Sequence, residues 1–138
     1  MRVKTKLDDG AFQLERAHAT DAGADIRTPK TFVVEGGGSA IVHTGLHVET
    51  PAGHVTLIKS KSGINIHGGV VCEGVVDEGY SGEIVVKLYN HSDRPVAFER
   101  GDKIAQLLIM PVLYADFEQV EEISGGERGS AGFGSTGK

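Results

Sequence analysis

Turn signals recur along this sequence at intervals of about 8 to 12 residues, and the segments between them are short for helices. Glycine supplies many of these breaks, with 20 glycines in 138 residues, about twice the average usage. Residues 83–89 alternate well, with Ile84, Val86 and Leu88 on one face of a strand. With no convincing amphipathic helix and no internal repeat, this pattern predicts an all-β domain, a sandwich or barrel of short strands.

The other expected strands are equally short and end at turn residues. They cover residues 31–35, 40–48, 54–59, 95–98 and 103–110. Residues 70–72 and 74–77 are expected to form the two arms of a hairpin whose tip lies near Glu73 and Gly74. By length the chain is one domain, which we assign to residues 1–123.

The composition changes at Ser124. From there to the end of the chain the apolar side chains are those of Ala131 and Phe133, among glycine and serine. Such a segment cannot bury enough surface to fold alone, so we interpret residues 124–138 as a flexible Gly/Ser-rich arm. It carries Arg128, Phe133, Ser135 and Thr136, whose side chains could bind phosphate and stack on a base.

Charge and cysteine content exclude several classes of function. The formal net charge of -5 argues against a sequence-independent DNA or RNA binder, although a few local cations could still neutralise one nucleotide. The lone Cys72 excludes an internal disulfide and fits a reducing compartment. No apolar run approaches the roughly 18 residues that span a bilayer, so we expect a soluble, cytoplasmic protein without membrane contact.

Four upstream segments carry candidate functional residues. Asp25 follows two small residues and could hold a water of a hydrated Mg²⁺, or could cap a turn. Residues 60–63, SKSG, could present a charge, a hydroxyl and a backbone N–H to a phosphate, or form an ordinary turn. Asp77 ends an apolar strand, where it could act as a general base beside the ring of Tyr80. Gln106 interrupts an apolar run, so its amide pairs with backbone or faces a ligand.

In sequence order, the segments AGADI, SKSG, GVVDEGYSGE, GDKIAQL and RGSAGFGSTG resemble the motifs of the trimeric dUTP diphosphatase (dUTPase) family. They extend from residue 22 to residue 137. The resemblance implies an all-β distorted jelly-roll of the dUTPase-like β-clip type, and a homotrimer with exchanged C-terminal segments and shared active sites. It also implies hydrolysis of dUTP to dUMP and pyrophosphate with Mg²⁺, which keeps uracil out of DNA and supplies dUMP for dTMP synthesis.

The resemblance assigns a role to each motif. Asp77 would activate water, Tyr80 would lie under the deoxyribose, and Asp25 would hold a metal-bound water. The segment from Val70 to Val75 would read the uracil edge, largely through backbone groups. The phosphates would be bound by Lys61, Ser62, Gly63 and Gln106. In the C-terminal arm, Phe133 would stack on uracil beside Gly134, and Arg128, Ser135 and Thr136 would bind phosphates.

The sequence departs from the family pattern in places. Lys61 and Ser60 stand where Arg and Pro are usual, so the bidentate guanidinium fork is absent. Gly79 stands where many members have a second Asp. The stretch from residue 62 to residue 77 is one residue shorter than in the better-known members. This difference leaves open whether Cys72 or Glu73 contributes to uracil recognition. Two alternatives remain: a dCTP deaminase-related enzyme, and a protein-binding regulatory switch operated by the nucleotide pocket.

Overall fold

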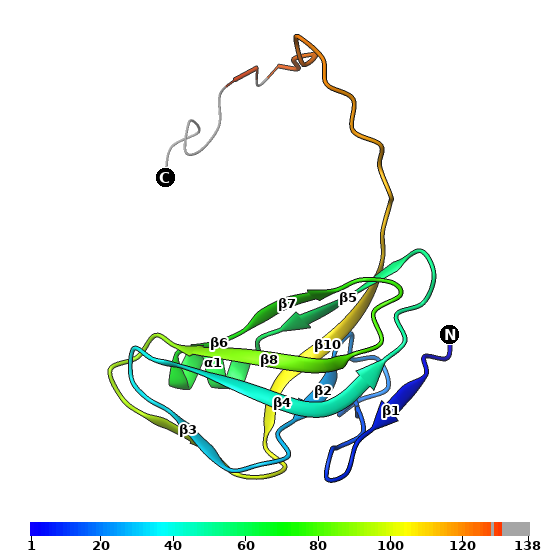
Figure 1. The fold of residues 1–138 in the computed structure, drawn as a ribbon. Helices are drawn as coiled ribbons and strands as arrows, with labels where there is room; N and C mark the ends of the chain where they lie inside the picture. Colours follow the sequence, from blue (N-terminus) through cyan, green and yellow to red (C-terminus); the bar gives the residue numbers. More distant parts are fainter. Residues whose placement is uncertain (128, 131–138) are drawn as a thin grey trace.

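The computed structural model describes residues 1–127 and 129–130. Within them, two four-stranded antiparallel sheets face each other (Figure 1). One sheet has the strand order β1-β4-β8-β6 and the other the order β2-β10-β5-β7. A two-stranded ribbon of β3 and β9 closes one end. The predicted all-β fold is confirmed.

Most strands begin and end close to the predicted positions. The first sheet contains β1 (Thr5–Leu7), β4 (Ser39–Val48), β6 (Val70–Val71) and β8 (Glu83–Asn90). The second sheet contains β2 (Ala24–Arg27), β5 (His54–Lys59), β7 (Glu73–Val76) and β10 (Lys103–Pro111). The ribbon consists of β3 (Phe32–Val34) and β9 (Val96–Phe98).

The core lies between the two sheets and follows the alternation of their strands. In β8 the side chains of Ile84, Val86 and Leu88 are buried, as the periodicity predicts. They pack with Ile58 from β5 and Ile104 from β10, in a single cluster that joins both sheets. Burial of these branched aliphatic side chains, each stabilising by about 1.5 to 3 kcal/mol, holds the two sheets together.

The predicted hairpin of residues 70–72 and 74–77 is wrong. β6 pairs with β8 in the first sheet, whereas β7 pairs with β5 in the second. Cys72 lies between the two strands and is buried, and the chain passes there from one sheet to the other. Two short apolar runs separated by a turn residue have the same local sequence pattern in a hairpin as in two strands of different sheets. The local pattern therefore could not distinguish these two arrangements.

A short helix, α1 (Ser62–Gly68), was not expected from the sequence. It buries none of its residues, so it lacks the amphipathic signal that identifies a helix. Its glycines and β-branched isoleucines also have low helix propensity. No helix in the described part of the chain is long and apolar enough to cross a membrane.

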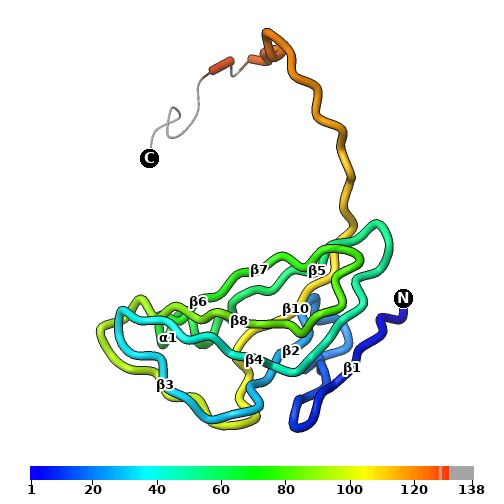
Figure 2. The backbone as a smooth tube through the Cα atoms, viewed as in Figure 1, coloured from blue at the N-terminus to red at the C-terminus, as the bar shows by residue number. Residues whose placement is uncertain are grey.

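After β10 the chain leaves the sheets and runs outward (Figures 1 and 2). Several apolar side chains of this segment are largely exposed, among them Leu113 at 92% and Phe117 at 95%. Val120 and Ile123 follow the same trend. The Val112 N–H still donates to the Gly53 carbonyl at 3.0 Å and the Tyr114 hydroxyl to Glu78 at 2.6 Å, so the chain leaves the body after residue 114, ahead of the expected start of the arm at residue 124. Exposed aromatic and aliphatic side chains in such a row are typical of a segment that packs on another surface.

Candidate active site

Asp77 directly follows β7 and lines a cavity of about 240 Å³. β7 and β8 follow each other in the chain but belong to different sheets, so they diverge instead of pairing. The cavity occupies the space between them, with Gly74 and Val75 on one wall and Ile84 and Val85 on the other. The Asp77 side chain is therefore exposed and fixed at a strand end, as the sequence predicts.

Tyr80 belongs to the turn that joins β7 to β8 and lines the same cavity. Its backbone N–H donates to the Asp77 carbonyl at 3.3 Å, and its hydroxyl donates to the Glu83 carbonyl at 3.0 Å. Gly79 precedes it with a φ of 87°, a conformation that favours glycine, so the turn is built around this departure from the family pattern. The turn thus brings Asp77 and Tyr80 together.

β7 offers a strand edge to the cavity. β5 pairs with one side of β7, and within the described residues no strand pairs with the other side. An edge strand carries unpaired N–H and C=O groups that can bind an extended or planar partner. Val75 is 63% exposed on this edge.

The other residues predicted near this edge have structural partners. Val70 is completely buried and Cys72 is 5% exposed, so both side chains belong to the core. Burial raises the pKa of the Cys72 thiol. Glu73 pairs with Lys59 across the strands. Ser60 holds the Cys72 backbone, accepting from its N–H at 2.8 Å and donating to its carbonyl at 2.9 Å.

A second polar group surrounds Asp25. Asp25 is buried on β2 and forms ion pairs with Lys61 and with Lys103, the latter at 2.6 Å. Burial opposes the charged form, but the hydrogen bonds from Lys103 and Lys61 outweigh it and lower the pKa of the Asp25 carboxyl. Lys103 was missed as an individual site residue, although the GDKIAQL motif contains it. A lysine on a strand is common, so the residue type alone gave no signal for this role.

Gln106 stands next to this ion cluster. Its amide donates to the Ser60 carbonyl at 2.9 Å, which is the backbone pairing that its position in an apolar run allowed. A Cβ at Gly23 would come within 2.4 Å of the Gln106 amide oxygen, so only glycine permits this close approach. Asp25, Lys61, Lys103 and Gln106 line a polar cavity of about 350 Å³.

The donor set of this cavity fits a magnesium ion carried by a ligand. Mg²⁺ is commonly bound by one or two carboxylates together with substrate phosphates, and it retains several waters. Asp25 supplies one carboxylate, and in the described part of the chain no group of three His, Cys, Asp or Glu side chains could hold an ion unaided. Residues Ser62 and Gly63 begin α1 and are exposed near Lys61 in the sequence.

The two polar groups lie at opposite ends of one sheet. Val76 pairs with Thr56, while Lys59 pairs with both Gln106 and Glu73. At about 3.3 Å per residue, Thr56 and Lys59 are about 10 Å apart, and Asp77 and Lys61 lie beyond them on opposite sides, so about 15 Å or more separates the two groups. Within one chain, therefore, they do not form one compact site.

A model of the dUTPase family matches residues 11–137. The chain belongs to the dUTPase family. Among curated dUTPases, the deoxyuridine 5'-triphosphate nucleotidohydrolase of Clostridium acetobutylicum is 38% identical over 99% of this chain and 96% of its own length. That of Nocardia farcinica is 43% identical over 96% of this chain and 82% of its own length. The predicted family and enzyme class are confirmed.

Solved dUTPase structures have the same fold. The dUTPase of Staphylococcus bacteriophage 80alpha with dUPNHPP superposes with a TM-score of 0.92, at 32% identity and covering 99% of both chains. A mutant dUTPase from phage phi11 of S. aureus, whose structure reveals the coordination of a structural Mg(II) ion, superposes with a TM-score of 0.81 at 29% identity, covering 88% of this chain and 98% of that one. The predicted site residues Arg128, Phe133, Gly134, Ser135 and Thr136 lie outside the described residues.

Proposed function

We propose that this dUTPase hydrolyses dUTP to dUMP and pyrophosphate, with Asp77 as the general base. The position of Asp77 carries the proposal, because it holds an exposed carboxylate at a rigid strand end, beside Tyr80 and a cavity between diverging strands. Family membership supplies the substrate, since the relatives that match over nearly the full length are named as deoxyuridine triphosphate nucleotidohydrolases.

In the proposed reaction, Asp77 accepts a proton from a water molecule while the water oxygen forms a bond to the α-phosphorus. The bond from the α-phosphorus to the oxygen that bridges to the β-phosphorus then breaks, and pyrophosphate leaves with that oxygen. A positioned carboxylate base contributes roughly 10² to 10⁴ in rate to such a step. The remainder of the rate enhancement comes from positioning the triphosphate and stabilising the charge on the leaving group.

The cavity between β7 and β8 is the proposed nucleoside pocket. The backbone N–H and C=O groups on the free edge of β7, around Gly74 and Val75, would form hydrogen bonds with the polar edge of uracil. Tyr80 would lie under the deoxyribose and exclude a 2′-hydroxyl. Because Val70 is buried on β6, we restrict the uracil-reading segment to β7.

The polar cavity around Asp25 is the proposed triphosphate site. Lys61 and Lys103 would exchange part of their pairing with Asp25 for phosphate oxygens, with Ser62, Gly63 and Gln106 as neighbouring donors. Mg²⁺ bound to the phosphates would supply charge neutralisation for the pyrophosphate leaving group. Asp25 would hold a water of that ion, and Lys61, as a point charge, would orient the phosphates less strictly than arginine.

The separation of the two cavities favours a site shared between chains of a homotrimer. A triphosphate cannot reach from Asp77 to Lys61 within one chain if the two groups are about 15 Å apart or more. A neighbouring chain that docks its Asp25 cavity against Asp77 would complete the site. The outward segment after β10 supports exchange, because its exposed Leu113, Phe117 and Ile123 need another surface to cover them. From the same segment, Arg128, Ser135 and Thr136 would reach the phosphates, and Phe133, beside Gly134, would reach the uracil.

The test is pyrophosphate release with dUTP, UTP, dCTP and dTTP in parallel, with and without Mg²⁺. We expect preference for dUTP, a requirement for Mg²⁺, and loss of at least about 10²-fold in kcat for Asp77→Asn. Asp93→Asn is the matched control, because Asp93 has a 94% exposed side chain. Full activity in Asp77→Asn would remove Asp77 as the base, and preference for dCTP would favour a deaminase-related substrate pocket.

A complementation experiment tests the shared site. Asp77→Asn should be inactive and Lys61→Ala should have little activity at dUTP concentrations below its raised KM. Trimers formed from both chains should regain activity under these conditions, since some sites then combine an intact Asp77 with an intact Lys61. The control is a mixture of Asp77→Asn with the double variant, which should stay inactive. If the mixed trimers remain inactive, or if light scattering finds a monomer, the shared site is refuted.

A further inference from the structure

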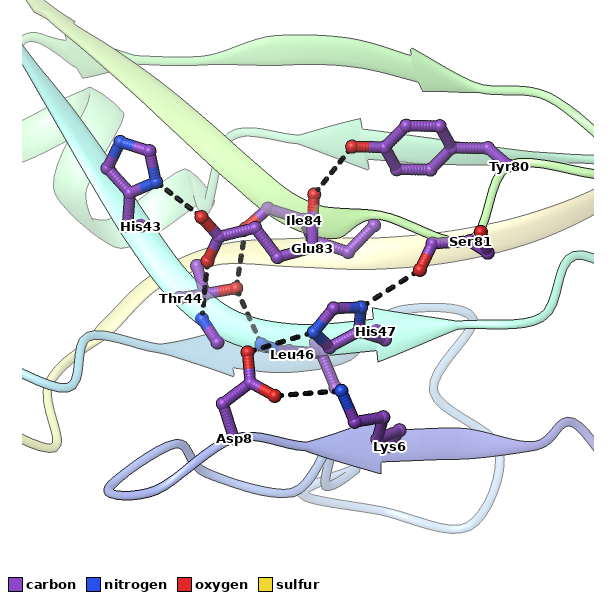
Figure 3. Close-up of polar contacts among 11 residues, drawn as sticks. Lys6, Asp8, His43, Thr44, Leu46, His47, Tyr80, Ser81, Glu83 and Ile84 are labelled. Carbon is purple, nitrogen blue, oxygen red and sulfur yellow. Dashed lines mark hydrogen bonds and ion pairs between the residues drawn. The ribbon is translucent and has the colours of Figure 1, made fainter.

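His47 lies at the centre of a polar network that connects the Tyr80 turn to β1 and β4 (Figure 3). In β4 it pairs with Lys6 of β1 on one side and with Glu83 of β8 on the other. The register of β4 against β8 shifts between His43 and His47. In this stretch the side chains of Thr44 and Glu83 form hydrogen bonds with the backbone of the opposite strand. The side chain of His47 is 18% exposed.

Both ring nitrogens of His47 face oxygen atoms that can only accept. Nδ1 lies 3.0 Å from the backbone carbonyl oxygen of Ser81, and Nε2 lies 3.0 Å from a carboxylate oxygen of Asp8. A neutral imidazole has one N–H and can donate to one of these partners. The imidazolium form donates to both, so this geometry favours a proton on each nitrogen.

The surroundings of His47 favour that charged form. The hydrogen bond to Asp8 and then the bond to the Ser81 carbonyl raise the pKa of His47, while burial and the charge of Lys6 oppose the rise. Lys6 pairs with the other carboxylate oxygen of Asp8 at 3.0 Å. The other titratable groups around the ring belong to Lys4, His43, Glu49, Tyr80 and Glu83.

The turn that carries Tyr80 is held on both sides of that residue. Before Tyr80, the Glu78 carboxylate accepts from the Gly53 N–H at 3.0 Å and from the Tyr114 hydroxyl at 2.6 Å. Glu83 is held to β4 by His43 and by the Gly45 N–H, which donates to its carboxylate at 3.0 Å. Ser81, directly after Tyr80, is held by His47 alone among the side chains described for this network. Loss of the Nδ1 proton removes the attachment of Ser81 and leaves those of Glu78 and Glu83 in place, so the effect falls on the residues directly around Tyr80.

We propose that His47 is a positioning residue, which in its imidazolium form holds the Tyr80–Ser81 turn against Asp8 and so maintains discrimination between deoxyribose and ribose. The inference rests on the proposed role of Tyr80 under the deoxyribose. It predicts that the preference for dUTP over UTP declines as pH rises through the pKa of His47, above the ordinary value of about 6.5. Misplacement of a positioned group by about 1 Å can cost up to 10²-fold, so we expect a decline on the order of tenfold.

The structural half is tested by NMR on the intact protein, without substrate. The His47 imidazole should titrate above its ordinary range, and the backbone amide signals of residues 79–82 should shift with the same midpoint. Asp8→Asn should lower that midpoint. The proposal is overturned if the turn amides do not respond to the titration, or if Asp8→Asn leaves the midpoint unchanged.

The functional half compares kcat/KM for dUTP and UTP between pH 6 and 9. Both substrates carry the same triphosphate and use the same base, so their ratio cancels the titration of these shared groups. The ratio should fall in the unaltered protein, should be low and independent of pH in His47→Ala, and should fall at lower pH in Asp8→Asn. His91→Ala, which removes an exposed imidazole at the far end of β8, should behave as the unaltered protein.

The two proposals fail in different ways. If neither nucleotide is hydrolysed, the proposed function is wrong, and the NMR titration still decides whether His47 holds the turn. If dUTP is hydrolysed and His47→Ala keeps the original ratio at every pH, the function stands and the positioning role is refuted.

Discussion

Asn90 provides a quantitative test of how β8 is held in the fold. It ends β8 and is 1% exposed, yet its amide is fully used. Nδ2 donates to the carbonyls of Val34 at 3.0 Å and Arg94 at 2.8 Å. Oδ1 accepts from the Ser92 N–H at 2.9 Å and the Ser92 hydroxyl at 2.7 Å. This side chain therefore ties β8 to β3 and to the loop before β9.

Asn90→Ala removes these hydrogen bonds, each contributing about 1 kcal/mol. The Ser92 groups are near the surface and recover part of the loss with water, whereas the buried Val34 carbonyl does not. We expect a loss of about 3 to 4 kcal/mol in the free energy of unfolding, which corresponds to roughly 10 to 15 °C in Tm for a domain of this size. Asn90→Asp should cost at least as much near neutral pH, because a carboxylate would then face two carbonyl oxygens.

Urea unfolding followed by circular dichroism measures this loss, at one fixed protein concentration because association stabilises the folded state. Asn65→Ala, an exposed asparagine on α1, is the matched control and should stay within about 0.5 kcal/mol of the unaltered protein. A loss below about 1 kcal/mol for Asn90→Ala would refute the argument that these bonds support β8.

Other predictions concern the Asp25 cavity. Gly23→Ala should displace the Gln106 amide from Ser60, lower the free energy of unfolding by about 1 to 2 kcal/mol and raise the KM for dUTP. An unchanged KM would show that Gln106 has only a structural role. Lys61→Arg should keep the pairing with Asp25 and lower the KM for dUTP, whereas Lys61→Met should raise it. Asp25→Asn should cost about 2 kcal/mol near neutral pH. Because folding lowers the pKa of Asp25, the stabilisation by its ionised carboxylate is present above about pH 4 and is lost as pH falls further. Urea unfolding at pH 3 should therefore show a smaller difference in stability between Asp25→Asn and the unaltered protein.

Local pattern was sufficient to predict the strands whose alternation is set by a single core. β5 was predicted with its observed bounds, and the buried and exposed faces of β8 follow the period of two in its sequence. The pattern failed where pairing is decided at long range. β6 and β7 are each short and apolar, and nothing local shows that they belong to different sheets.

The candidate site shows the same division. Asp77, Tyr80 and the SKSG segment could be selected from residue type and order, because turns fix them close to strand ends. Lys103 and His47 could not be selected in this way, since a lysine or histidine on a strand is common and its meaning depends on what lies across the sheet. Their partners, Asp25 and Asp8, are far away in sequence.

A site built from residues at opposite ends of one sheet, as proposed above, would explain why so much of the chain carries motif residues. A site completed within one chain needs only neighbouring strand ends, whereas a site shared between chains needs two separate surfaces and a segment that crosses between them. Under the proposal, these three parts would be Asp77 after β7, Lys61 beyond the far end of β5, and the outward segment after β10. In such a site each part would have to be positioned independently, so a local contact such as that of His47 with the Ser81 carbonyl would influence specificity directly.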